Sequence, residues 1–193
     1  MQIMMRSSLP FRAVLTAAAL CLSAGLAAAE TPAGYMQRVA NELVAATRSA
    51  TPVQSFATVL RSHADLPTIG LTALGSYANS LSKADRPSYY SAMVNWISRY
   101  AAKEAPKYPV ARAIMVGQTT ESAGVAYVDS TITLRSGTVY DVRWVIVKRG
   151  SVYKVRDAEY LGFRISSSLD NLFQNFMSEN GGNPRKLILA LNG

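Results

Sequence analysis

The sequence contains few of the side chains on which metal sites and covalent catalysis depend. It has one cysteine, Cys21, and one histidine, His63, among 193 residues. A lone histidine without a nearby cysteine cannot build a histidine-based metal site or a Cys/His pair. A serine triad would also have to use His63, and no G-x-S-x-G motif occurs. These absences argue against a hydrolase, and we expect no metal and no cofactor.

Features typical of nucleotide-binding proteins are missing as well. No glycine-rich phosphate loop or dinucleotide motif occurs, and Gly181-Gly182 follow an expected helix rather than a strand. Basic residues are scattered in runs of no more than two, a pattern that does not predict a nucleic-acid-binding surface. We therefore expect a partner other than a nucleotide or a nucleic acid.

Long hydrophobic runs are absent after residue 29. The run at residues 13–26 is small and apolar, follows two arginines, and is too short to span a bilayer. Residues 27–29 are all alanine, which suits cleavage by a signal peptidase. This pattern predicts a signal peptide over residues 1–29, cleaved before Glu30.

The mature chain is then expected to be exported and soluble, with one domain over residues 30–193. Cleavage would discard Cys21, so the mature protein has no disulfide. Without Arg6 and Arg12, 18 basic residues remain against 12 acidic ones, a net charge of +6. This charge favours acidic partners, such as anionic lipid headgroups or an acidic protein surface. We expect a monomer.

Residues 31–106 show the apolar spacing of four helices. Thr31-Pro32 and Thr51-Pro52 each combine a capping threonine with proline at the first helical position, and Gln54 completes a predicted capping box in the second helix. A third helix is expected at residues 66–81. The fourth has the clearest apolar stripe, which consists of Tyr89, Met93, Trp96, Ile97 and Tyr100.

From about residue 109 the apolar period changes to two and β-branched residues accumulate, which predicts strands. Short turns with glycine separate these strands, so we expect an antiparallel meander. Its four strands are predicted at residues 112–119, 125–134, 138–148 and 152–161. In the third strand an apolar set is expected to face inward, namely Tyr140, Val142, Trp144 and Ile146.

Two further helices are predicted after the sheet. The first ends at Gly181-Gly182 and has an apolar stripe, namely Leu169, Leu172, Phe173, Phe176 and Met177. The second begins at Asn183-Pro184. Helices on both sides of an antiparallel meander indicate an α+β fold. We expect its curved four-stranded sheet and its helices to enclose an apolar pocket, as in a nuclear-transport-factor-like cup.

Carboxylates on the predicted strands leave two interpretations open. Asp141, Asp157 and Glu159 all lie on strands. A strand carboxylate that points into an apolar pocket can act as a general base, and an enzyme acting on a small apolar substrate could use Asp141 or Asp157 in this way. The same carboxylates can instead form cross-strand ion pairs with basic residues, namely Arg143, Lys154 or Arg156.

The order of several segments along the chain is informative. They are Leu74-Gly75-Ser76-Tyr77, the turn at 82–87 with the helix to Tyr100, the strand at 153–157, and the stretch from Phe176 through Gly182 to Leu191. In this order they resemble the MlaC family of periplasmic phospholipid-binding proteins, also called toluene-tolerance auxiliary proteins. The resemblance covers nearly the whole mature chain.

The resemblance implies a phospholipid carrier rather than an enzyme. Such a carrier moves lipid between an inner-membrane ABC transporter complex, through its ring-forming lipid-binding subunit, and an outer-membrane lipoprotein complex, which maintains outer-membrane lipid asymmetry. The apolar and aromatic residues are then expected to contact acyl chains. The predicted lipid-binding residues are Trp96, Ile97, Tyr100, Tyr140, Val142, Trp144, Ile146, Phe173, Phe176 and Met177.

Overall fold

The structure, a computed structural model, describes residues 30–193, so the predicted signal peptide at residues 1–29 lies outside the described residues. Helix α1 (Pro32–Thr47) begins as predicted, because Thr31 Oγ1 accepts a hydrogen bond from the backbone N–H of Gly34 at 3.1 Å. Helix α2 (Pro52–His63) also has proline at its first position.

The capping box predicted for α2 is wrong. Thr51 has a ψ of 67°, whereas the capping residue Thr31 has a ψ of 154°, and the Thr51 side chain makes no capping hydrogen bond. The hydroxyl of Ser49 instead accepts hydrogen bonds from the Thr51 backbone N–H at 3.1 Å and from the Ser55 hydroxyl at 2.8 Å. The backbone turn before α2, rather than the side-chain sequence, therefore decides how this helix end is satisfied.

A glycine shortens the third helix. Helix α3 (Leu66–Leu74) stops before Gly75, which has a positive φ of 53°. The chain continues as the 3₁₀ helix η1 (Gly75–Ser80), so the single helix predicted at residues 66–81 is two elements.

The other helices lie on either side of the sheet in the sequence. Helix α4 (Arg86–Glu104) and the 3₁₀ helix η2 (Ala105–Lys107) precede the strands, and α5 (Ser166–Glu179) and α6 (Pro184–Asn192) follow them. Helix α5 ends as predicted, because Gly182 has a φ of 68° and its N–H donates to the Met177 carbonyl at 2.7 Å.

Five antiparallel strands form one sheet in the order β1-β2-β3-β4-β5. Their bounds are β1 (Val110–Ser122), β2 (Val125–Leu134), β3 (Val139–Arg149), β4 (Val152–Tyr160) and β5 (Phe163–Arg164). The predicted meander is confirmed, but the prediction of four strands is wrong. Strand β5 pairs back on β4 through Tyr160 and Phe163, and its two residues are too few to show an alternating pattern.

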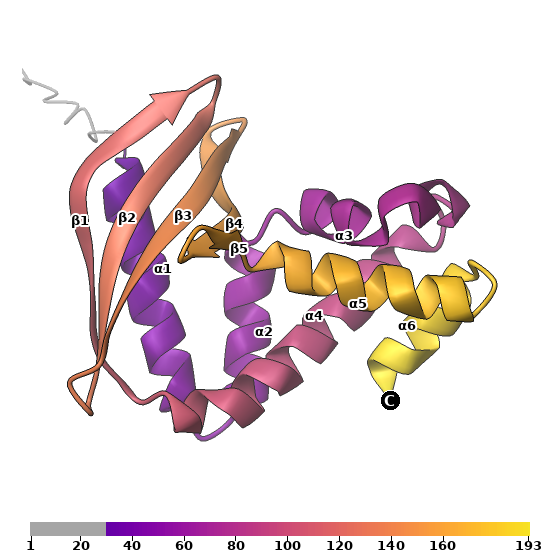
Figure 1. The fold of residues 1–193 in the computed structure, drawn as a ribbon, viewed down its shortest axis with the longest axis horizontal. Helices are drawn as coiled ribbons and strands as arrows, with labels where there is room; N and C mark the ends of the chain where they lie inside the picture. The colour runs from indigo at the N-terminus through magenta and orange to yellow at the C-terminus, as the bar shows by residue number, and fades with distance from the viewer. Residues whose placement is uncertain (1–29) are drawn as a thin grey trace, which may run out of the picture.

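Figure 1 shows α1 and α2 along one face of the sheet, while α4 runs diagonally away from the foot of the sheet. Helices α3, α5 and α6 gather around the far end of α4, and α4 contacts both α2 and α6. The predicted mixed α+β fold is confirmed. Between residues 30 and 193, each helix is too short or too polar to cross a bilayer.

Buried apolar residues form two separate clusters. The helical cluster joins α3, α4, α5 and α6 and contains Ala73, Leu74, Leu81, Tyr89, Ala92, Met93, Phe173, Met177, Leu187 and Leu191. The sheet-side cluster joins α1, α2, β2 and β3 and contains Tyr35, Met36, Val39, Val59, Ala126, Val128 and Ile146. The space between sheet and helices beyond the second cluster is incompletely filled, and the candidate site lies there.

Candidate functional site

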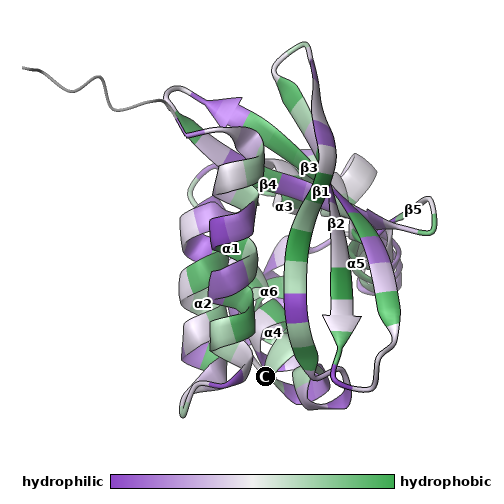
Figure 2. Ribbon diagram, turned by 90° about the vertical axis from the view of Figure 1, so that its left-hand side faces the viewer, coloured by the Kyte–Doolittle hydropathy of each residue, from purple (hydrophilic) through white to green (hydrophobic). Residues whose placement is uncertain are grey.

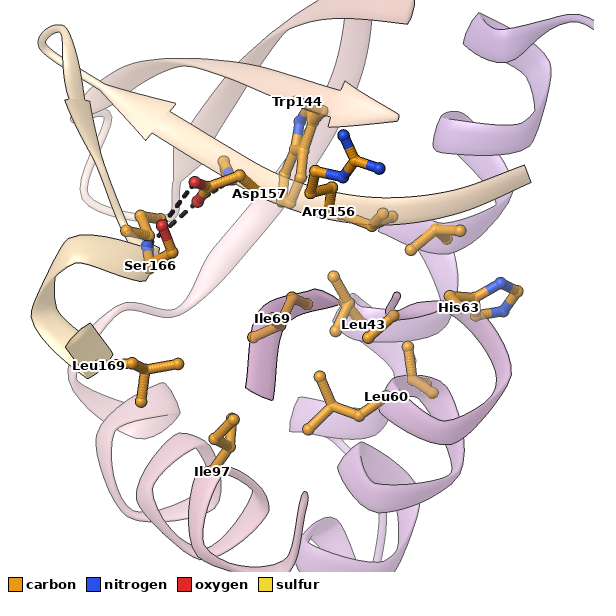
Figure 3. A pocket seen from close by; sticks show the side chains of 16 residues that line it. Leu43, Leu60, His63, Ile69, Ile97, Trp144, Arg156, Asp157, Ser166 and Leu169 are labelled. Carbon is orange, nitrogen blue, oxygen red and sulfur yellow. Dashed lines mark hydrogen bonds between the residues drawn. The ribbon is translucent and has the colours of Figure 1, made fainter. Parts of the chain in front are cut away.

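Two apolar cavities, here named cavity A and cavity B, lie between the sheet and the helices. Cavity A has a volume of about 230 Å³ and is lined by α1, α2, α3, α4, β3, β4 and the start of α5. In Figure 3 apolar side chains from five of these helices point toward its centre, and the labelled ones are Leu43, Leu60, Ile69, Ile97 and Leu169. Side chains far apart in the sequence therefore form a single apolar wall.

Cavity B has a volume of about 340 Å³ and lies between α1, α2, the end of α4 and the first three strands. Its lining is also mainly apolar and includes Phe56, Ala101, Tyr108, Met115 and Ile132. The charged side chain in its lining is Glu104, which forms an ion pair with Lys107 at 2.8 Å. The cavity therefore suits a hydrocarbon rather than a charged ligand.

Leu43 and Trp144 line both cavities and so stand between them. The indole of Trp144 is held in place, because its Nε1–H donates to Ser130 Oγ at 2.9 Å. Ser130 is itself buried, and its hydroxyl donates to the Val142 carbonyl at 3.1 Å. This chain of hydrogen bonds satisfies the polar end of the indole, which leaves its apolar ring to form the shared wall.

The carboxylate of Asp157 lies at the edge of cavity A and already has three donors. Its Oδ1 accepts from the backbone N–H groups of Ala158 at 2.8 Å and Ser166 at 3.1 Å, and its Oδ2 accepts from the Ser166 hydroxyl at 2.6 Å. This carboxylate therefore holds the first turn of α5 against β4. The three hydrogen bonds give the Asp157 carboxylate a structural role, which accounts for its position without the enzyme hypothesis.

Asp141, the other candidate base, lies away from both cavities. Its carboxylate is exposed and accepts from Thr131 Oγ1 at 3.0 Å, in a polar groove that Arg143 and Glu159 also line. Arg143 pairs there with Asp129 at 2.8 Å. A cross-strand ion pair is therefore present in this groove, but it joins Arg143 to Asp129, and the pairing that the sequence suggested between Arg143 and Asp141 does not form.

His63 lines cavity A and takes part in a partly buried network that the sequence did not predict. Its Nδ1 lies 3.1 Å from the Tyr35 hydroxyl, and its Nε2 lies 2.7 Å from Glu42 Oε2. Burial raises the pKa of Tyr35 to about 12, so this phenol stays protonated. Both ring nitrogens of His63 therefore have partners. Among residues 30–193, no group of three or more histidine, cysteine or acidic side chains is placed to hold a metal.

The structure places two of the ten predicted lipid-binding residues on the cavity walls: Trp144 lines both cavities and Ile97 lines cavity A. The other members of the β3 set lie elsewhere. Ile146 is fully buried in the sheet-side cluster, Val142 lines the polar groove, and Tyr140 packs edge-on against Tyr160 at 5.5 Å between ring centroids.

The predicted residues of α5 lie in the helical cluster. Phe173 and Met177 are fully buried there, and Phe176 packs against the same cluster. Trp96 contacts Phe173 edge-on at 6.2 Å and stacks on Tyr100 at 5.7 Å, while Tyr100 itself is exposed. The structure therefore brings most of the α4 and α5 stripes together against α3 and α6, while Ile97 and Leu169 face cavity A, which Trp144 also lines.

Several cavity residues were not selected from the sequence, notably Leu43, Leu60, Ile69, Phe56 and Leu169. Each of them occupied an apolar position of a predicted helix, so the helical period was available as a signal. That period shows which residues turn inward, but not whether the opposite element fills the space in front of them.

Comparisons with known proteins agree with this architecture. The family model described as "MlaC protein" matches residues 36–193. The fold is similar to that of a phospholipid-binding protein from Ralstonia solanacearum, solved in complex with a phospholipid, with a TM-score of 0.66. That alignment has 16% sequence identity and covers 83% of this chain and 94% of the other. A search of curated proteins gave no match.

Proposed function

Because this chain belongs to the MlaC family, we propose that it is a carrier of phospholipid in the periplasm. In this proposal residues 1–29 direct export and are removed, and residues 30–193 form a soluble domain that encloses acyl chains. The carrier exchanges lipid with an inner-membrane ABC transporter complex and its ring-forming lipid-binding subunit, and with an outer-membrane lipoprotein complex.

The observation that carries the proposal is the pair of apolar cavities that share Leu43 and Trp144. A phospholipid has two acyl chains, and two adjoining cavities offer a separate place for each chain. Leu43 and Trp144 would then contact both chains. The phospholipid in the similar structure from Ralstonia solanacearum supports the same assignment.

Simple energetics explain why such a lipid needs a carrier. Burying one CH₂ group is worth about 0.8 kcal/mol, so two chains of roughly 15 methylenes would cost about 24 kcal/mol to expose to water. A carrier must replace the bilayer around the chains without binding them so tightly that unloading stops. This task requires apolar surface rather than a nucleophile or a metal.

Lipid extraction tests the proposal directly. Protein purified without detergent is expected to release about one phospholipid per chain into organic solvent, measured by mass spectrometry. Ala113→Phe would add a ring to the wall of cavity B and is expected to lower the lipid content. Ala111→Phe is the matched control, because Ala111 is exposed on the same strand and does not line that cavity.

Folded protein that carries no lipid and takes none from vesicles would contradict the carrier function. In that case, loss of activity toward a small apolar substrate in Asp157→Asn would support the enzyme alternative. Export is tested separately by N-terminal sequencing of periplasmic protein, which is expected to begin at Glu30. A start before Ala24 or beyond Pro32, or a lipid attached to Cys21, would contradict the signal-peptide prediction.

A further inference from the structure

Exposed hydrophobic side chains gather at the hairpin between β4 and β5. Leu161 and Phe163 are 75% and 77% exposed, Ile165 is 55% exposed, and Tyr160 is also exposed. Figure 2 shows this hairpin projecting from the body of the protein with a hydrophobic tip. Single exposed apolar residues are common on protein surfaces, whereas four within six consecutive residues indicate an interaction site.

The backbone of the hairpin turn gives a second, independent observation. Leu161 has a φ of 52° and Gly162 a φ of 80°, so both central residues of the two-residue turn are in the left-handed region. Such a turn favours asparagine or glycine, and a leucine there is conformationally disfavoured. Because Leu161 is exposed, core packing does not account for its presence. Strain at an exposed apolar residue points to a role outside the fold.

The hairpin is fixed beside the opening of cavity A. Ile165 and Ser166 line that cavity, although Ile165 is more than half exposed, so this part of the wall lies next to solvent. The backbone N–H of Ile165 donates to the Ala158 carbonyl at 2.8 Å, and the Ser166 hydroxyl donates to Asp157 at 2.6 Å. These bonds hold the apolar tip and the cavity opening in one orientation.

The shape of the tip and the net positive charge of the chain favour a lipid surface. Arg164 is the basic residue of the tip, Glu159 precedes the tip, and residues 30–193 together carry 18 basic against 12 acidic side chains. The Arg164 side chain is 61% exposed and forms an ion pair with Glu159 at 3.3 Å. A narrow convex tip with two apolar side chains, on a chain with an excess of basic residues, fits a deformable anionic bilayer, whereas a protein interface usually buries a broader surface.

We propose that Leu161 and Phe163 insert into the surface of an anionic phospholipid bilayer and place the opening of cavity A against it. This inference rests on the proposed carrier function, because it supplies the route by which acyl chains enter or leave the cavity. Docked in this way, an acyl chain passes between bilayer and protein without crossing bulk water.

Vesicle flotation tests this surface. The purified wild-type protein is expected to float with vesicles of phosphatidylethanolamine and phosphatidylglycerol. The double variant Leu161→Ser with Phe163→Ser is expected to lose at least about tenfold in vesicle partitioning, because two apolar side chains no longer insert. Leu189→Ser is the matched control, because Leu189 is 73% exposed but lies on α6, away from the hairpin. This variant is expected to bind vesicles like the wild type.

Melting temperature and lipid content are measured for each variant, and the melting temperature is expected to match the wild type. Wild-type protein that contains phospholipid but does not float would overturn the hairpin inference and leave the carrier function standing. Wild-type protein that floats but contains no extractable phospholipid would contradict the carrier function and leave the membrane contact of the hairpin standing. An equal loss of vesicle binding in Leu189→Ser would also overturn the inference. Unchanged vesicle binding in the double variant would overturn the inference too. If that variant instead lost binding to a protein partner, the hairpin would be a protein-binding surface.

Discussion

The helical cluster and the region around the cavities are built from the same kinds of residues but packed differently. In the helical cluster, Tyr89, Met93 and Phe173 have no exposed surface. Beside the cavities, Ile97 and Trp144 also face inward, yet each remains half-buried because a cavity lies in front of it. For these side chains the neighbouring cavity, rather than their aromatic or aliphatic type, accounts for the difference in burial.

The close packing of the helical cluster has an identifiable cause. A Cβ atom at Gly70 would lie 2.9 Å from Tyr89 Cε1, so α3 can approach the Tyr89 ring only because this residue is glycine. The Tyr89 hydroxyl also donates to the Gly70 carbonyl at 2.8 Å. Leu43 of α1 and Trp144 of β3 instead both border the open space of cavities A and B.

The largest effect is expected from a truncation in the helical cluster. Phe173→Ala removes a fully buried ring from closed packing, so it is expected to lower the free energy of unfolding by about 3–5 kcal/mol in denaturant titrations. Phe163→Ala is the control, since the same change at an exposed residue is expected to leave stability nearly unchanged. A loss below about 1 kcal/mol at Phe173 would show that the helical cluster is not closed.

The next effect concerns the joint between the two regions. Asp65 precedes α3, is buried, and forms an ion pair with Arg149 of β3 at 2.6 Å. Asp65→Asn is expected to lower the free energy of unfolding by about 1–3 kcal/mol at pH 7, because Arg149 loses a charged partner. The control Asp129→Asn breaks an exposed pair with Arg143, and it is expected to cost less than about 1 kcal/mol.

The Asp65 contribution is expected to depend on pH. Burial alone would raise the pKa of Asp65, but the hydrogen bonds from Arg149 and Thr68 and the charges of Arg149 and Arg156 together lower it below its usual 3.8. A lowered pKa stabilises the folded state above pH 3.8, and this stabilisation disappears as the pH falls through the folded-state pKa. The difference between wild type and Asp65→Asn is therefore expected to shrink below about pH 4. A constant difference across that range would contradict this assignment.

A matched pair on α4 compares the two regions within one helix. Met93 is fully buried in the helical cluster, and Ile97, four residues later, lines cavity A. In lipid-free protein, Met93→Ala is expected to cost about 2–5 kcal/mol and Ile97→Ala about 1 kcal/mol, because Ile97 already borders open space. Lipid content is expected to fall only in Ile97→Ala. Equal stability losses would mean that cavity A collapses when it is empty.

The sequence predicts several features that depend on neighbouring residues, although the capping box at Thr51 is not among them. Thr31 and Asn183 cap their helices, Gly182 ends α5, and the strand alternation gives the antiparallel meander. It does not show which apolar stripes meet closed packing, because that depends on distant residues such as Gly70 beneath Tyr89. For the same reason Phe173 and Leu43 look alike in sequence, although one lies in the closed core and the other beside both cavities.

The smallest change in the free energy of unfolding is expected at the hairpin tip beside cavity A, where a substitution should stabilise the protein rather than destabilise it. Leu161→Asn replaces a disfavoured left-handed leucine with a residue that tolerates this conformation, so it is expected to raise the free energy of unfolding by about 0.5 kcal/mol. Vesicle binding is expected to fall in the same variant, because an apolar side chain is lost from the tip. The control Ala123→Asn changes an equivalent position with a φ of 50° in the turn between β1 and β2, and it is expected to gain similar stability without losing vesicle binding. If Leu161→Asn instead destabilised the protein, Leu161 would contribute to the fold, and its exposure could no longer be explained by a membrane contact.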